Sequence, residues 1–161
     1  MKRLALVFAL AAVFAAPALA QNAGEISRVQ SGSSCSGCNL FQADLAYRDL
    51  PNVNLSGSRL RQASLSLSTM NGANFSRSDL SIADMFGGRF TGASFANANL
   101  QNANLVGAYF GSANFSGAVL TGAILSGAEM ENVRGLTQAQ LDTACGDRDT
   151  RLPAGLRIPA C

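Results

Sequence analysis

Four cysteines are the residues of this 161-residue sequence with the most distinctive chemistry. Cys35 and Cys38 form a C-x-x-C motif, whereas Cys145 and Cys161 lie near the other end of the chain. Paired thiols at the first spacing occur in redox-active sites and as one half of zinc sites. A reactive thiolate is favoured beside a cation at a helix N-terminus, but no basic residue stands next to this motif. The motif alone leaves both interpretations open.

Other side chains that commonly catalyse reactions are scarce. The sequence has no histidine, and its only lysine is Lys2. It contains neither a G-x-S-x-G nucleophile motif nor a phosphate-binding glycine loop. We therefore predict that the protein is not an enzyme, with no catalytic residues, no metal site and no cofactor.

The chain from residue 38 to residue 132 repeats every five residues. Counting in fives from Leu40 to Met130, all nineteen positions are Leu, Phe or Met, and a small residue, most often Ala, stands two residues before most of them. A helix turns about 100° per residue and a flat strand alternates its faces, so neither would bring these residues to one side. The chain must instead turn once per pentapeptide. This pattern predicts a solenoid around a column of stacked side chains.

The repeated units resemble a known family. The pattern A-(D/N)-L-x-x is typical of pentapeptide-repeat proteins, and it is seen in Ala43-Asp44-Leu45, Ala73-Asn74-Phe75, Ala98-Asn99-Leu100 and Ala113-Asn114-Phe115. The resemblance implies an all-β fold, a right-handed quadrilateral β-helix with four pentapeptides per coil and about five coils in this chain. Every twentieth residue should then stack, which gives a core ladder of Leu55, Phe75, Phe95 and Phe115.

Residues 1–20 are predicted to be a signal peptide. Lys2 and Arg3 precede an apolar run, and Ala18-Leu19-Ala20 supplies small residues of the kind that a signal peptidase recognises. The run is shorter than the roughly 20 apolar residues that span a bilayer. We expect an exported protein, periplasmic or secreted, with no membrane span after cleavage. An N-terminal anchor helix is the alternative interpretation.

The rest of the chain divides around the repeats. Residues 21–37 are polar and rich in Gly and Ser and should form a short lead-in segment. The solenoid covers residues 38–134 and stops at Gly135, where the repeat would need a large residue. Residues 135–161 are then a C-terminal cap and a disulfide-tied tail.

The start of a capping helix is visible in this last segment. Thr137 and Gln140 form a capping-box pair, which predicts a short α-helix over about residues 138–145. The last coil of a solenoid needs such a cap because it would otherwise expose core side chains and an unpaired strand edge. Leu136, Leu141 and Ala144 are the apolar residues available to cover that end.

Stacking of the coils also constrains the cysteines. Coils about 4.8 Å apart place the two ends of the solenoid roughly 20 Å apart or more. Cys35 can therefore reach Cys38 but not Cys145, which argues against one zinc site shared by all four cysteines. We predict two disulfides, Cys35–Cys38 and Cys145–Cys161, formed in an oxidising compartment. A thiol-redox protein that uses Cys35 and Cys38 stays as an alternative function.

The charge of the chain bears on a second alternative. The sequence has twelve Lys and Arg and ten Asp and Glu, so ten arginines balance the ten acidic residues once Lys2 and Arg3 are removed. Some family members imitate the charge and shape of DNA and inhibit DNA-binding enzymes, which requires a strongly acidic surface. A neutral surface does not provide one, and it does not attract nucleic acid strongly either. We expect no nucleic-acid partner.

The same register gives positions for the carboxylates and for one unusual arginine. Asp44 and Asp84 fall in one column two coils apart and do not converge with other acids on a cleft. Arg48 occupies a position where later repeats have Ala. Because an unpaired buried charge is costly, we expect Arg48 to reach solvent or, alternatively, to pair with Asp44 or Asp49.

A scaffold or protein-interaction module is the function class that remains. Tyr47 and Leu67 fall in adjacent coils on one edge, and Phe86 and Val106 fall in adjacent coils on the same side. Exposed apolar residues in a strip can mark a partner site, although single ones are ordinary surface. We predict that this strip contacts an unidentified protein or envelope component, and we leave homodimerisation open. Val119 and Ile124 are expected to be shielded by the C-terminal cap.

Overall fold

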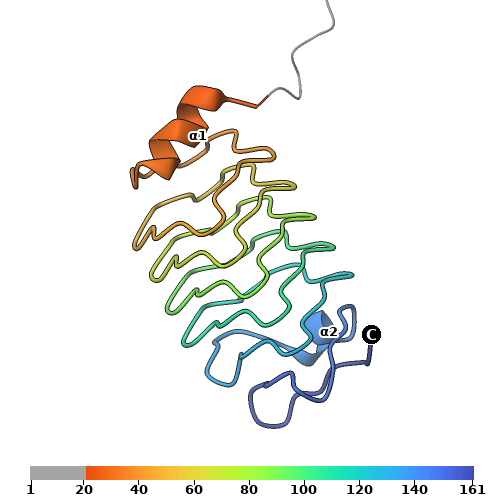
Figure 1. Cartoon of the computed structure of the whole chain (residues 1–161). Helices are drawn as coiled ribbons and strands as arrows, with labels where there is room; N and C mark the ends of the chain where they lie inside the picture. The colour runs from red at the N-terminus through yellow and green to blue at the C-terminus, as the bar shows by residue number, and fades with distance from the viewer. Residues whose placement is uncertain (1–20) are drawn as a thin grey trace, which may run out of the picture.

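The computed structural model describes residues 21–161 of the chain. In this range two helices, α1 (Ala23–Gln30) and α2 (Gln138–Leu141), flank a stack of coils. Figure 1 shows the coils following one another along a single axis, with α1 beside the first coil and α2 beside the last. The predicted signal peptide lies outside the described residues.

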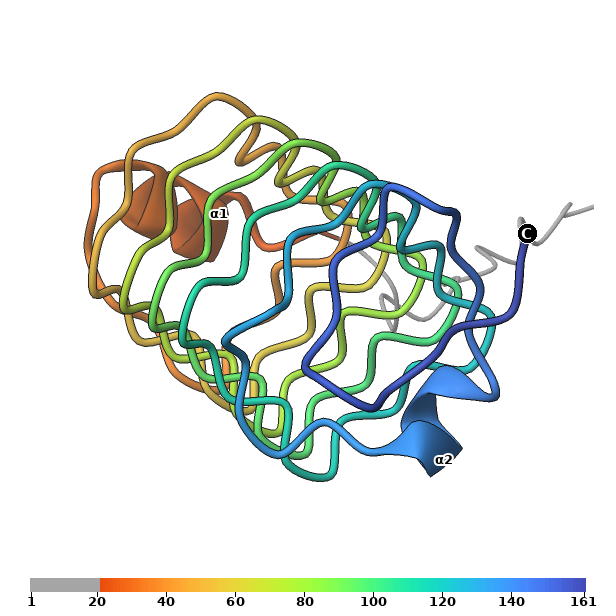
Figure 2. The same ribbon diagram turned by 90° about the horizontal axis from the view of Figure 1, so that it is seen from below.

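Parallel β-bridges join each coil to the next. From Asn39↔Arg59 to Asn114↔Arg134, every bridge connects residues twenty positions apart, and bridges recur every five residues. Each coil therefore has four short extended sides separated by corners, and the coils form nested four-sided outlines when seen along the axis (Figure 2). This register agrees with the one expected from the repeat.

The large residues of the repeat fill the interior. All nineteen, from Leu40 to Met130, are at most 3% exposed. In the predicted ladder, the rings of Phe75, Phe95 and Phe115 stack with successive centroids 5.1 Å apart. A second column that the sequence analysis does not identify, Phe90 and Phe110, stacks at 5.4 Å and meets the first column edge to face. The two columns interlock into one aromatic core, a geometry that favours aromatic pairs.

The Asp or Asn that precedes a core residue closes the corner that follows it. Its side-chain oxygen accepts a hydrogen bond from the backbone N–H two residues later, as Asn54 does from Ser56 (3.1 Å) and Asn74 does from Ser76 (3.0 Å). These are Asx turns, in which a short side chain takes the place of a backbone acceptor. They give a physical reason for the polar position of the repeat motif.

The second residue after each core residue bends the chain through the left-handed region. Eighteen such residues, in steps of five from Gln42 to Gly127, have a positive φ, and so does Gly37, two residues after Cys35. Glycine adopts this φ without a steric penalty, and asparagine tolerates it. Tyr47, Leu67 and Ile82 adopt it as well, with φ of 58°, 55° and 59°, and bulky side chains are strained there.

The lead-in segment contains α1, a helix that is not expected from the sequence. Asn22 caps it by accepting a hydrogen bond from the N–H of Glu25 (3.2 Å), and Val29 is fully buried. Glu25 Oε2 also accepts from the N–H of Asn39 (2.6 Å), while Gln30 Nε2 donates to the carbonyl of Asp44 (2.8 Å). The helix thus covers the N-terminal end of the core and pairs part of its backbone edge.

The C-terminal segment covers the opposite end. The Thr137–Gln140 capping box is present, but α2 ends at Leu141 instead of near residue 145. Leu141 and Ala144 are buried, and Leu136 packs partly against the core. The bridges Ile124↔Cys145 and Glu129↔Arg151 extend the ladder beyond the last regular coil.

Of two expectations about the surface, the one for Val119 and Ile124 is wrong and the one for Arg48 is met. Val119 and Ile124 stay 46% and 42% exposed, so the expectation that the cap shields them is wrong. The cap lies across the end of the stack, whereas these side chains point outward from its sides. Arg48 is exposed, and no ion pair joins it to an acid within residues 21–161, so it reaches solvent as expected.

Candidate functional site

The four residues of the predicted apolar strip, Tyr47, Leu67, Phe86 and Val106, follow one corner of the solenoid. The N–H of Tyr47 donates to the carbonyl of Ser66 (3.0 Å), that of Leu67 to Phe86 (2.8 Å), and that of Gly87 to Val106 (2.9 Å). Tyr47 is 77% exposed, Leu67 and Phe86 are each 45% exposed, and Val106 is half-buried. The structure therefore brings the predicted residues together on consecutive coils.

Packing makes the middle of the apolar strip continuous. A Cβ added to Gly87 would lie 2.8 Å from Leu67 Cδ2, so the side chain of Leu67 leans over Gly87 in the next coil. Gly87 is the residue directly after Phe86. Because Gly87 has no side chain, Leu67 has room to lie against the backbone next to Phe86.

The backbone of the apolar strip is unusual for its residue types. Tyr47 and Leu67 occupy left-handed corners, where most other coils have Gly, Asn or Gln. A strained conformation that persists at an exposed position gains nothing from core packing. Ile82, on another edge, has the same backbone and a similar exposure, so this conformation belongs to the corner geometry of the repeat and does not by itself mark a site.

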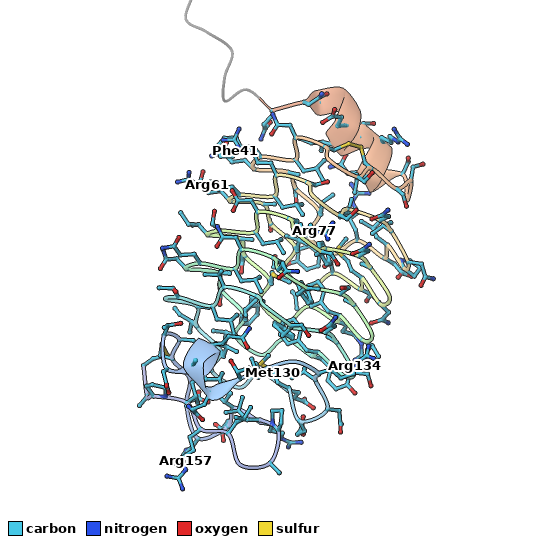
Figure 3. All side chains as sticks on the ribbon, turned by 180° about the vertical axis from the view of Figure 1, so that it is seen from behind. Phe41, Arg61, Arg77, Met130, Arg134 and Arg157 are labelled. Carbon is cyan, nitrogen blue, oxygen red and sulfur yellow. A yellow bond between two sulfur atoms is a disulfide. The ribbon has the colours of Figure 1, made fainter. Side chains whose placement is uncertain are left out.

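Charged side chains are dispersed over the surface instead of gathered in one patch. Arg61, Arg77, Arg134 and Arg157 are exposed and lie at different levels from the first coils to the cap (Figure 3). Two further arginines lie over aromatic rings, Arg59 over Phe41 at 4.9 Å and Arg89 over Tyr109 at 5.5 Å. A dispersed arrangement of this kind produces no strong local field.

Two carboxylates of the coils have side-chain partners in the next coil. Asp79 Oδ1 accepts from Asn99 Nδ2 (3.2 Å), and Asp84 Oδ1 accepts from Asn104 Nδ2 (2.9 Å). Each of these pairs joins two neighbouring coils along one face. Within residues 21–161 no group of Cys, Asp or Glu has the arrangement of a metal site.

All four cysteines form disulfides, with the predicted pairing Cys35–Cys38 and Cys145–Cys161. The Cα atoms of the two pairs are 5.7 and 4.8 Å apart. Cys35 and Cys38 are 3% and 9% exposed, so the C-x-x-C motif is part of the core at the N-terminal end. Cys145 is half-buried and Cys161 is exposed.

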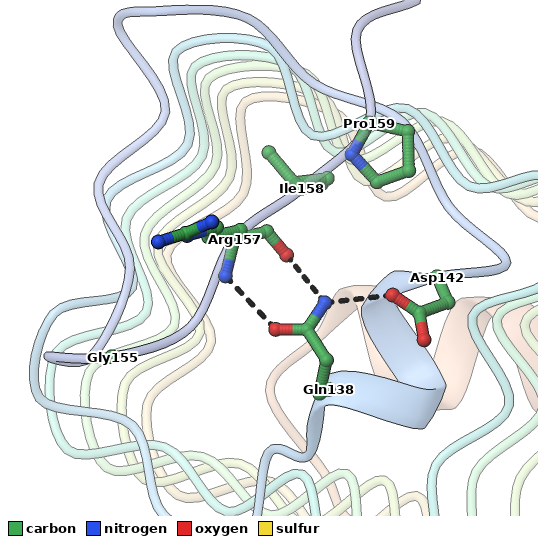
Figure 4. A pocket seen from close by; sticks show the side chains of 6 residues that line it. All are labelled: Gln138, Asp142, Gly155, Arg157, Ile158 and Pro159. Atoms are coloured by element: carbon green, nitrogen blue, oxygen red, sulfur yellow. Dashed lines mark hydrogen bonds between the residues drawn. The ribbon is translucent and has the colours of Figure 1, made fainter.

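A cavity of about 490 Å³ lies between α2 and the last residues of the chain (Figure 4). Its walls come from Gln138, Asp142, Gly155, Arg157, Ile158 and Pro159. The Gln138 amide donates to Asp142 Oδ1 (2.7 Å) and to the Arg157 carbonyl (2.9 Å), and it accepts from the Arg157 N–H (3.0 Å). These polar groups fasten the tail to α2. The repeat pattern gives no sign of this cavity, because it depends on how the non-repetitive tail folds back.

Neither α1 nor α2, the helices found in residues 21–161, is long and apolar enough to cross a membrane.

Several solved structures are similar to this chain. A pentapeptide-repeat protein (Rfr23) from the cyanobacterium Cyanothece 51142 is 27% identical, over 80% of this chain and 97% of that one, with a TM-score of 0.41. A pentapeptide-repeat protein from the Arabidopsis thaliana thylakoid lumen is 25% identical (76% and 83% covered, TM-score 0.33). QnrB1, a plasmid-mediated fluoroquinolone resistance protein, is 19% identical (70% and 71% covered, TM-score 0.35). No curated protein matches the sequence.

The family is decided by the repeats themselves. The family model described as pentapeptide repeats matches residues 38–77, 49–85, 73–111 and 98–134, and these matches together span more than half of the chain. The match coincides with the part of the structure in which core residues recur every five positions and bridges every twenty. The chain belongs to the pentapeptide-repeat family.

Proposed function

We propose that this protein is an exported, non-catalytic scaffold that binds a protein or a component of the cell envelope through the apolar strip. Members of this family are mostly structural or regulatory proteins, and they commonly contact other proteins. The observation that carries the proposal is the row of exposed apolar side chains on consecutive coils, Tyr47, Leu67 and Phe86, in which Leu67 lies against the segment of Phe86.

The apolar strip is suited to binding because it is already ordered. Its backbone is held by hydrogen bonds to the next coil, so binding would not have to fix a flexible loop. Tyr and Phe are also residue types that often contribute most to interface energy. A partner with a complementary apolar ridge or groove would remove the exposed faces of Tyr47 and Phe86 from water.

Export is the second part of the proposal, and two observations support it. Residues 1–20 have the pattern of a signal peptide, and two disulfides suit an oxidising compartment. Mass spectrometry of the protein from fractionated cells should give an N-terminus at Gln21 in the periplasmic or secreted fraction. An intact Met1 in the cytoplasm would contradict export and leave the apolar strip as a separate question.

The binding proposal is tested by affinity capture from a cell-envelope fraction with the oxidised protein as bait. The Tyr47→Ser/Phe86→Ser double variant should lose the captured partner. Ile82→Ser is the matched control, because Ile82 is also an exposed apolar residue at a left-handed corner but lies on a different edge. It should retain the partner.

Sedimentation velocity on the same three proteins tests whether the partner is a second copy of the chain. A dimer that the double variant loses and the Ile82→Ser variant keeps would make the apolar strip a homodimer interface. If the wild-type protein captures nothing and stays monomeric, or if the double variant behaves as the wild type, the apolar strip is ordinary surface and the proposal fails.

A further inference from the structure

The disulfide at the C-terminal end joins a fixed residue to a loosely held one. The backbone of Cys145 is part of the ladder, since its N–H donates to the Ala123 carbonyl (3.0 Å) and its carbonyl accepts from the Leu125 N–H (2.8 Å). Cys161 is exposed, and its N–H donates to the carbonyl of Gly146 (3.0 Å). The disulfide thus fastens the C-terminal tail, residues 152–161, to the last coil.

Few other contacts hold the C-terminal tail in place. Gly146 donates its N–H to the Pro159 carbonyl (2.9 Å), and the Gln138 amide forms the two bonds to the Arg157 backbone described above. Leu152 and Ile158 are only partly buried against the core. A segment with so little buried apolar surface opens easily once its covalent link is removed.

The Cys35–Cys38 disulfide at the N-terminal end is buried, and both of its residues are fixed in the ladder. Cys35 and Cys38 are buried, and their backbones are held by the ladder, with the Cys35 N–H donating to the Asn54 carbonyl (2.8 Å) and the Arg59 N–H donating to the Cys38 carbonyl (2.9 Å). The Ser58 hydroxyl donates to the Cys35 carbonyl as well (2.8 Å). A reductant reaches these sulfurs with difficulty, and the coil does not depend on their bond for its position.

We propose that Cys145–Cys161 is a redox-sensitive closure, which a dithiol reductant opens to release the C-terminal tail while Cys35–Cys38 and the coils stay intact. A thiolate of the reductant attacks the exposed Sγ of Cys161, the S–S bond breaks, and Cys145 leaves as a thiolate that takes up a proton. The second thiol of the reductant then attacks the mixed disulfide and releases Cys161 as a thiol. One protein disulfide is reduced to two thiols, and one dithiol is oxidised to a disulfide.

Opening the closure changes the surface at this end. Arg157, Ile158 and Pro159 leave the cavity beside α2, which loses one of its walls. The N–H and carbonyl of Gly146 lose their partners, and Gly146 itself is uncovered, because Ile158 packs within 3.1 Å of the position of a Cβ on Gly146. An edge with unpaired backbone groups can accept an added strand. The reduced form therefore presents a binding edge that the oxidised form covers.

The order of reduction is the first test. The folded, oxidised protein is treated with increasing dithiothreitol, alkylated with iodoacetamide, and analysed by peptide mass spectrometry. Cys145 and Cys161 should be labelled at reductant concentrations that leave Cys35 and Cys38 unlabelled. Labelling of all four cysteines together, or of the N-terminal pair first, would overturn the proposal.

Hydrogen exchange tests whether the tail is released. The amides of Gly146 and Cys161 should exchange at least about 10-fold faster after selective reduction, while the amide of Arg59 is unchanged. The Cys145→Ser/Cys161→Ser variant should show the same fast exchange without reductant. The matched Cys35→Ser/Cys38→Ser variant should keep Gly146 protected until dithiothreitol is added. If Gly146 remains protected in the Cys145→Ser/Cys161→Ser variant, the disulfide does not hold the tail and the proposal is wrong.

Discussion

Core residues and corner residues of this protein are under different constraints. Every core position in a coil has a neighbour of the same kind in the next coil, as in the Phe75–Phe95–Phe115 ladder. Corner residues instead take whatever backbone angle the turn requires, even where the side chain resists it. Substitutions at these two kinds of position should therefore have opposite effects on stability.

Phe95 is the residue whose truncation should be most damaging. It is fully buried, and its ring contacts Phe75 and Phe115 in its own column and Phe90 and Phe110 in the other. We expect Phe95→Ala to lower the free energy of unfolding by roughly 3 to 5 kcal/mol in urea denaturation. Gln101→Ala, at an exposed position with an ordinary backbone, is the control. A similar loss in both variants would contradict the assignment of inward and outward positions.

Tyr47 should show the reverse behaviour. Asn tolerates the left-handed backbone better than Tyr, so the replacement removes strain. It removes no buried contacts, because the Tyr47 ring is exposed. Tyr47→Asn is expected to keep or raise the free energy of unfolding, by up to about 1 kcal/mol, while weakening partner capture. A clear drop in thermal stability in calorimetry would mean that Tyr47 supports the fold and that its left-handed backbone is not strained.

At the level of elements, the ends of the solenoid are protected largely by polar side chains of the caps. Glu25 and Gln30 of α1 bond to backbone groups of the first coil. At the other end Gln140 Nε2 donates to the carbonyls of Phe115 and Ala118 (2.9 and 2.8 Å), and Thr150 Oγ1 donates to that of Leu125 (3.0 Å). Such contacts pair edges that would otherwise promote aggregation.

Glu25 provides a test of this role at the N-terminal end. Glu25→Ala should destabilise the protein by about 1 to 2 kcal/mol, because the N–H of Asn39 loses its charged acceptor. Glu25→Gln keeps an acceptor and should recover most of that loss. Exchange of the Asn39 amide, followed by NMR, separates a local effect from global unfolding. Equal stability of Glu25→Ala and the wild type would show that the contact does not support the cap.

Asp147 makes the C-terminal end sensitive to acid. The hydrogen bond from the Gly127 N–H (2.9 Å), together with those from Thr150 and Asp149, lowers the pKa of Asp147 below its ordinary value. A carboxyl group with a depressed folded-state pKa stabilises the fold above its unfolded pKa, and this contribution disappears as the pH falls through the folded pKa. Protection of the Gly127 amide should therefore decrease below about pH 4. In Asp147→Asn that decrease should be absent; if it persists, another group is responsible.

At the level of the whole molecule, the repeat made the fold predictable and the ends less so. A period of five with large residues at every step allows few arrangements, so the core residues follow from the spacing. The twenty-residue register, and with it the apolar strip, follows from the resemblance to pentapeptide-repeat proteins. α1 is only eight residues long, and its signal consists of Asn22 before Glu25 and of Ile26 and Val29 one turn apart, which is weak beside nineteen repeats. The cavity and the exposure of Val119 and Ile124 depend on how the tail folds back, which no local pattern determines.

Because each coil bonds only to its two neighbours, the number of coils can change without altering the contacts between the end coils and their caps. Inserting or deleting twenty residues would add or remove one layer and shift the two caps by about 4.8 Å, with the sides of the coils still in line. An insertion whose length is not a multiple of twenty residues would rotate one cap relative to the other. The separation between the two ends of the molecule can therefore change only in whole steps of one coil.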